Sequence, residues 1–181
     1  MPFRIFWLAV SFAILNSTSF AMAASAPATQ DIVAKHAASV AFLGVRLQND
    51  NEGLEPTSDS ERLRLRKLED MFKHKLTQSE RYTFVSVPDD VKAKIKSGQF
   101  IGECHGCEVD YGRRLGATLI AWVTVQKVSN LILNLNVFMA DVATEKMTFV
   151  HSVDIRGNTD ESWRRSLDYL IENYLLSASG T

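Results

Sequence analysis

The segment 118-TLIAWVTVQKVSNLILNLNVFMADVATEKMTFVHSVDI-155 determines the fold, because it contains three strand-like runs in succession. Each run is rich in aliphatic, β-branched and aromatic residues, which favour strands. We predict strands at 118–127, 131–141 and 146–155, separated by short polar turns at 128–130 and 142–145. Connections this short join antiparallel neighbours, so the segment is predicted to form a β-meander.

Alternation along the middle run indicates which of its faces is buried. One face carries only aliphatic side chains: Leu131, Leu133, Leu135 and Val137. The other face mixes two amides with two apolar residues: Ile132, Asn134, Asn136 and Phe138. Successive side chains of a strand point to opposite faces, so we predict that the mixed face is half exposed to solvent.

The residues before this segment predict helices that alternate with two further strands. Residues 40–47 (VAFLGVRL) form an apolar run of strand length, and 82–87 (YTFVSV) alternate as a second strand does. A capping box of Ser58 and Glu61 opens a predicted helix over 59–76, with apolar residues at helical spacing behind it. A short helix is expected from Pro88 to about residue 97.

Two more helices complete the order of elements. Cys107, Tyr111 and Leu115 recur at intervals of four, so the second cysteine is placed at the start of a third helix. A last helix of about sixteen residues is predicted after Asn158, with Asn158 as its cap and Glu161 reaching back. We expect Trp122 and Trp163 to lie in the core.

The resulting order is β-α-β-α-α-β-β-β-α. The first strands need crossover connections through helices, while the last three can form the meander. We therefore predict an α/β (α+β) protein with a mixed sheet of about five strands and helices packed on it. Residues 38–177 are predicted to form one domain with one core.

The amino terminus is predicted to be a cleavable secretory signal peptide over residues 1–23. Arg4 precedes an apolar run over 5–15, and Ala21-Met22-Ala23 follows as a cleavage signal, with a cut after Ala26 as the alternative. The apolar run is about half the ~20 residues that span a bilayer, so we expect no membrane anchor after cleavage. Residues 24–37 are predicted to be a flexible leader and 178–181 a tail. The expected location is the periplasm.

Charge gives little information about partners. The chain carries 20 Lys+Arg and 21 Asp+Glu, a formal net charge of −1 at pH 7. No basic patch suited to nucleic acid stands out, and no Walker loop, GxGxxG or His-Glu-x-x-His motif occurs. We therefore expect no nucleic-acid partner and no cofactor, and we favour a protein that is not an enzyme.

Both cysteines belong to one motif, Cys104-His105-Gly106-Cys107. Haem attachment needs Cys-x-x-Cys-His, but Glu108 follows the second cysteine. A zinc site needs about four ligands, and only the two cysteines and His105 are local, so we predict no metal. A redox dithiol stays open, because a helix N-terminus stabilises a thiolate. In an exported protein we favour a structural disulfide between Cys104 and Cys107.

Polar side chains around the start of the last helix form a predicted interaction patch: Arg156, Asn158, Asp160 and Arg164. The acidic residues of this stretch could in principle bind a cation. Helix capping and compensation of the helix dipole already account for Asn158, Asp160 and Glu161, so no metal is predicted there.

The order of elements resembles the amino-terminal domain of TolB and the related domain of curli-secretion and flagellar outer-membrane accessory proteins. The residues that carry the resemblance include VAFLGVRL, YTFVSV and the closing SVDIRGNTDESWRR. Leu115-Gly116-Ala117 matches the step from helix to strand in such domains, whereas Glu145 replaces the glycine of their Asp-x-x-Thr-Gly turn. The region from Cys104 to Arg165 also resembles a group of short exported proteobacterial proteins known only as a domain of unknown function.

The resemblance implies a noncatalytic periplasmic accessory protein that docks on a larger envelope assembly. A mixed sheet has two edges, so strand addition or the half-exposed sheet face is the expected means of docking. Two alternatives remain. One is a small-molecule-binding auxiliary of a periplasmic oxidation system, and the other is a thiol-redox protein that uses Cys104 and Cys107.

Overall fold

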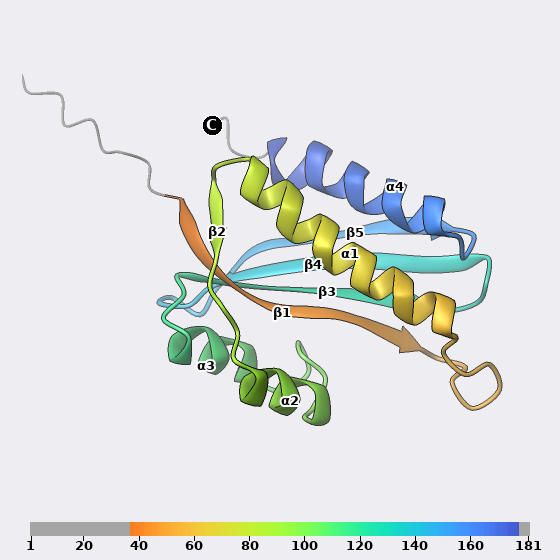
Figure 1. The fold of residues 1–181 in the computed structure, drawn as a ribbon, viewed down its shortest axis with the longest axis horizontal. Helices are drawn as coiled ribbons and strands as arrows, with labels where there is room; N and C mark the ends of the chain where they lie inside the picture. Colours follow the sequence, from red (N-terminus) through yellow and green to blue (C-terminus); the bar gives the residue numbers. More distant parts are fainter. Residues whose placement is uncertain (1–36, 178–181) are drawn as a thin grey trace, which may run out of the picture. The chain divides into compact units, whose positions relative to one another are not determined.

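A computed structural model describes residues 37–177, and it confirms the mixed five-stranded sheet and the predicted order of elements (Figure 1). The strands are β1 (Ala38–Asn49), β2 (Tyr82–Phe84), β3 (Leu119–Lys127), β4 (Ile132–Asp141) and β5 (Met147–Arg156). The helices are α1 (Asp59–Gln78), α2 (Asp89–Ser97), α3 (Cys107–Arg114) and α4 (Asp160–Leu170), which continues as a π-helix, η1 (Ile171–Leu175). The predicted signal peptide, nearly all of the predicted leader and the predicted tail lie outside the described residues.

The strands lie side by side in the order β2-β1-β3-β4-β5. β1 is parallel to both β2 and β3, whereas β3, β4 and β5 form the predicted antiparallel meander. The two edges of the sheet therefore differ in length. β2 has only 3 residues, and β5 has 10.

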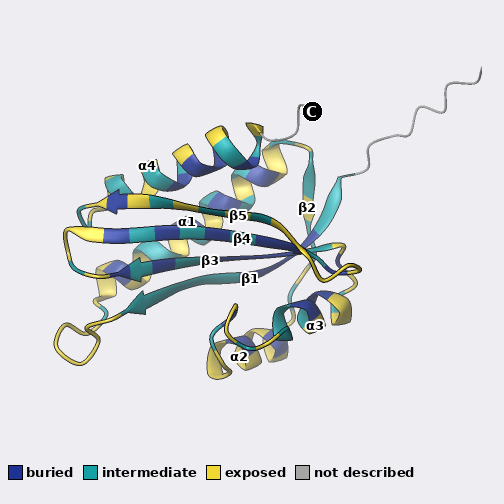
Figure 2. Ribbon diagram, turned by 180° about the vertical axis from the view of Figure 1, so that it is seen from behind, coloured by how far each residue is buried: buried dark blue, intermediate teal, exposed yellow. Residues whose placement is uncertain are grey.

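Helices cover the two faces of the sheet unevenly (Figure 1). α1 and α4 pack on one face over the larger core, where Phe72, Trp163 and Leu167 are fully buried. α2 and α3 pack on the other face over a smaller core that contains Ile120 and Trp122. Because α3 contacts β1 and β3, this second layer leaves the outer face of β4 and β5 open, and β5 is largely exposed in Figure 2. The half-exposed face predicted for β4 is thus confirmed.

The two long helices begin with capping boxes, one of which differs from the prediction. Ser58 and Glu61 cap α1 as expected. For α4 the predicted cap Asn158 is wrong, because Thr159 is the cap and Ser162 reaches back. The side chain of Asn158 is instead hydrogen-bonded to Glu61, 97 residues earlier in the chain. A tertiary contact therefore selects between two adjacent residues that could each cap a helix.

The turn between β4 and β5 contains a strained residue. Thr144 donates from its N–H and its hydroxyl to Oδ1 of Asp141, at 2.7 and 2.8 Å. Glu145 then adopts φ +60°. This is the left-handed region that favours glycine.

Glu145→Gly is expected to raise the free energy of unfolding by about 0.5–1 kcal/mol. Glycine relieves the strain of the left-handed conformation, which costs about 1–2 kcal/mol. Glycine also increases the conformational entropy of the unfolded chain, and this offsets part of the gain in stability. Urea unfolding measures the change. Glu145→Ala is the control, since it removes the same exposed ion pair with Arg113 but keeps the strain. A glycine variant no more stable than the alanine variant would show that the turn is not strained.

Candidate interaction surface

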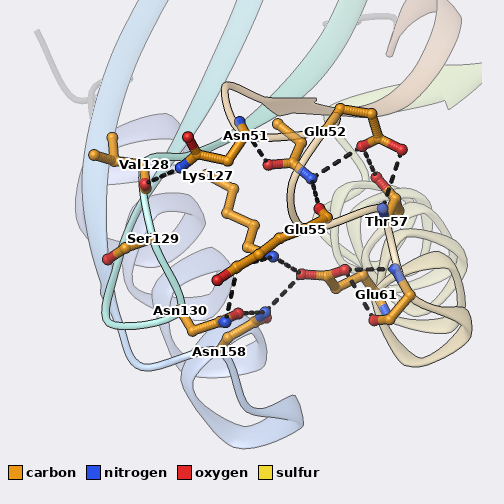
Figure 3. A network of polar contacts seen from close by, with 12 residues as sticks. Asn51, Glu52, Glu55, Thr57, Glu61, Lys127, Val128, Ser129, Asn130 and Asn158 are labelled. Carbon is orange, nitrogen blue, oxygen red and sulfur yellow. Dashed lines mark hydrogen bonds and ion pairs between the residues drawn. The ribbon is translucent and has the colours of Figure 1, made fainter.

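A buried ion pair joins the end of β3 to the start of α1 (Figure 3). Nζ of Lys127 lies 2.9 Å from Oε1 of Glu61, and the two residues are 3% and 1% exposed. Sequence reasoning identified Glu61 only as part of a capping box and did not identify Lys127. A lysine at a strand end resembles any exposed polar residue, so no sequence signal marked it.

Asn158 extends this pair into a network that connects three parts of the chain (Figure 3). Its Nδ2 donates to Oε1 of Glu61 at 2.7 Å and to Oδ1 of Asn130 at 3.0 Å. Its Oδ1 accepts hydrogen bonds from Nε1 of Trp163 and from Arg64, both at 3.0 Å. One amide thus holds α1, α4 and the β3–β4 turn together.

The network also controls the ionisation of its charged members. Burial opposes the charge on Glu61, but hydrogen bonds from the backbone of Ser58 and from Lys127 and Asn158 outweigh it and lower the pKa of Glu61 to about 2. Burial likewise opposes the charge on Lys127, while its hydrogen bond to Glu61 raises the pKa of Lys127 above the usual value. Every charge of the pair is compensated within the protein, so the network stabilises the fold and leaves little for a ligand to bind.

The predicted interaction patch is divided by the structure. Asn158 belongs to the network, Asp160 accepts from Arg64 and Lys67 at 2.8 and 2.6 Å, and Arg164 forms ion pairs with two acidic residues of α4. Arg156 is exposed at the end of β5, and its side chain forms no ion pair within residues 37–177. Its role in an interaction stays a prediction.

The Cys-His-Gly-Cys motif forms a tight turn before α3. Cys104 and Cys107 lie at disulfide distance, 2.02 Å between their sulfurs, and both are half-buried. Oε2 of Glu108 lies 2.8 Å from Sγ of Cys104, so the two sulfurs and this carboxylate form a possible set of three metal ligands. Two sulfurs bonded to each other are poor metal ligands, and His105 is exposed beside them.

β5 presents an unpaired edge to solvent. The N–H of Gly157 donates to the carbonyl of Leu131, so these two residues form a hydrogen-bonded pair of the ladder between β5 and β4. Along an antiparallel ladder such pairs alternate with pairs that are not hydrogen-bonded to each other. The backbone groups of Val150, Ser152 and Asp154 therefore point away from β4. No strand within residues 37–177 pairs with this edge.

A groove runs beside this edge, between β5 and α4. Its volume is about 530 Å³, and it is lined by Ser152, Val153, Asp154, Arg156, Arg165, Ser166 and Tyr169. The hydroxyl of Ser166 donates to the carbonyl of Asp154 at 3.0 Å, so this outward-facing carbonyl is within reach of a hydrogen-bond donor outside the sheet. Tyr169 is 52% exposed above the groove. The carbonyl of Asp154 is thus already engaged, while no strand of residues 37–177 satisfies the outward backbone groups of Val150 and Ser152, which lie beside this partly apolar wall.

The chain matches the model of a known family. The family model DUF3280, described as "Protein of unknown function (DUF2380)", matches residues 38–175. This confirms the predicted relation to a domain of unknown function. None of the curated proteins compared with the chain matches it.

Solved structures match the chain at the level of the fold. Lipoprotein GNA1162 from Neisseria meningitidis has 14% identity and a TM-score of 0.50, over 80% of this chain and 99% of that one. The LpoB C-terminal domain from Escherichia coli has 13% identity and a TM-score of 0.48, over 65% and 82%. TolB from Acinetobacter baumannii has 13% identity and a TM-score of 0.43, over 74% of this chain and 28% of that one.

Within residues 37–177, no helix combines the length and the apolar composition that a membrane span needs.

Glu61→Gln is expected to lower the free energy of unfolding at neutral pH by about 3 kcal/mol, the low end of the cost of breaking a buried pair, because Lys127 then keeps only the carboxylate of Glu55, 3.5 Å from its Nζ. The wild type should lose the contribution of Glu61 as the pH falls from about 4.5 toward 2, since the folded pKa of about 2 lies below the ordinary value. The variant should not show this part of the acid dependence. Urea unfolding at several pH values measures both effects.

Glu69→Gln is the matched control, because Glu69 forms a half-exposed ion pair with Lys73 and its loss should cost less than about 1 kcal/mol. Equal losses in the two variants would contradict the role given to the buried pair.

Proposed function

The chain belongs to the DUF3280 family, and we propose that it is a noncatalytic accessory protein of the cell envelope that docks on a partner protein by strand addition. The open edge of β5 carries this proposal. A strand of 10 residues with outward-pointing backbone groups is a template for another strand, and natural sheets commonly shorten or cover such edges. An extended segment paired with β5 would satisfy these groups, and its side chains would enter the groove beside α4.

The location in the envelope rests on two sequence features and on the type of fold. Residues 1–23 have the pattern of a secretory signal peptide, and the cysteines are paired as expected in an oxidising compartment. The fold is shared with lipoprotein GNA1162 from Neisseria meningitidis. Together these features favour the periplasm, where a docking surface on β5 would meet other envelope proteins.

Ser152→Pro tests the edge directly. The N–H of Ser152 points away from β4, so proline removes a donor that only an added strand would use and leaves the ladder to β4 intact. Affinity capture from envelope extracts of the native host should give a stoichiometric protein partner with the wild type and with Ser152→Ala. The proline variant should remain folded and lose the partner. Retention of the partner by the folded proline variant would exclude the β5 edge.

Thiol–disulfide exchange is the second candidate function, because Cys107 is half-buried at the first residue of α3. A helix N-terminus stabilises a thiolate and so favours exchange. Such a role would suit a redox protein or an auxiliary of a periplasmic oxidation system. A disulfide that only fixes the turn would need no exchange at all.

The double variant Cys104→Ser, Cys107→Ser separates these roles. If the bridge is structural, the variant should stay folded, lose about 1–2 kcal/mol because the closed loop is very short, and keep its partner. A redox titration read by thiol alkylation and mass spectrometry should then place the bridge below about −300 mV. A bridge that opens near about −200 mV, with loss of function in the double variant, would favour the redox role.

A further inference from the structure

A second groove lies on the open face of the sheet, under the loop between α2 and α3. Its volume is about 430 Å³. Its floor is formed by Trp122 and Phe138 of the sheet. The overhanging loop contributes Phe100 and Gly102. The rim carries two acidic residues, Glu103 and Glu108. Met147 and Val150 of β5 also line it, so the groove is continuous with the strand whose edge is open.

The floor of the groove holds a hydrogen-bond donor that solvent reaches and that has no acceptor within residues 37–177. The rings of Trp122 and Phe138 are stacked, with centroids 5.0 Å apart, and Trp122 is 4% exposed. Its indole N–H donates to no acceptor within residues 37–177. A side-chain carbon at Gly102 would lie 3.2 Å from Nε1 of Trp122, so the glycine brings the loop close to the indole nitrogen without covering it with a side chain. The rest of the ring is buried while the N–H is open to the groove, so an acceptor that enters the groove can replace water as its partner.

The rim carries uncompensated negative charge. Neither Glu103 nor Glu108 forms an ion pair with another residue of the described range 37–177. Arg46 contacts the loop but is already engaged there, because it stacks on Phe100 at 4.5 Å and donates to the carbonyls of Lys96 and Gln99. A cation at the rim would therefore meet two carboxylates that no cation of the described residues neutralises, although Glu108 also contacts Sγ of Cys104.

We infer that this groove binds a basic segment of the partner protein, with a backbone carbonyl accepting from the indole N–H of Trp122 and a lysine or arginine side chain on Glu103 and Glu108. The inference rests on the proposed docking function and adds the chemistry of the partner. The partner segment that pairs with β5 would continue across Val150 onto the open face. Its apolar side-chain carbons would pack on Phe138, as the stems of long basic residues do.

The same arrangement gives the cysteine motif a positioning role. Cys104 follows Glu103 directly, and Cys107 precedes Glu108. The bridge between the cysteines fixes the turn that carries both carboxylates, so less conformational entropy is lost when a cation binds there.

The test uses two blocked peptides, acetyl-Thr-Lys-Val-Lys-Thr-amide and the same peptide with norleucine in place of both lysines. Titration into ¹⁵N-labelled mature protein should shift the indole N–H signal of Trp122 and leave that of Trp163, which is bonded to Asn158, unchanged. The lysine peptide should bind about tenfold more tightly than the norleucine peptide, as expected for hydrogen bonds to charged groups. The double variant Glu103→Gln, Glu108→Gln should lose this preference.

The matched control is Glu69→Gln, Asp70→Asn, which removes the same charge from α1 on the other face of the sheet and should keep the preference. Equal affinity for the two peptides, or no shift at Trp122, would overturn the inference. The Ser152→Pro variant separates it from the proposed function, because it blocks the edge but leaves the groove intact and should still bind the lysine peptide. Loss of the native partner by that variant, together with equal peptide affinities, would support docking on β5 and exclude the basic segment.

Discussion

Backbone hydrogen bonding along β5 is the constraint on which the rest of the structure depends. Every other long strand of the sheet has neighbours on both sides, whereas β5 has β4 on one side only. Solvent can satisfy the outward groups, but an open edge of this length invites pairing with any extended chain. Both ends of β5 have features that oppose such pairing. Near its start the ladder has a register shift, opposite Met139 and Ala140 of β4. Near its end it carries the charged residues Asp154 and Arg156. The middle, around Val150 and Ser152, stays open, which is consistent with a docking edge.

The rest of the fold holds this edge in a fixed geometry. α4 packs against β5, and Asn158 ties the start of α4 to Glu61 in α1 and to the β3–β4 turn. The network is buried and its charges are paired, so it holds the start of the helix that forms one wall of the edge groove against the sheet. On the opposite face, α2 and α3 cover only the β1 and β3 half, and the loop between them overhangs the open half. The edge and the groove under the loop thus belong to one continuous, uncovered part of the molecule.

Much of this architecture could be predicted from local patterns. The period of two in β4 identified its buried and open faces, the short turns identified the meander, and Ser58 with Glu61 identified the start of α1. The order of strands across the sheet could not be predicted, because pairing between β1 and β3 depends on contacts far apart in the chain. Lys127 and Asn158 were missed or misassigned for the same reason: each looks like an ordinary polar residue until the fold brings it to Glu61. The groove over Trp122 likewise exists only once the loop lies on the sheet.

The central claim is that a partner protein docks on the open edge of β5. The most direct measurement is photo-crosslinking in the native host, with a photoreactive amino acid placed at Val150 in one strain and at Arg66 in another. Val150 is 58% exposed on β5, and Arg66 is exposed on α1, which covers the other face of the sheet. The account predicts one discrete crosslinked protein from position 150 and none from position 66. A discrete crosslink from position 66 alone would contradict it and place the docking surface on the helical face.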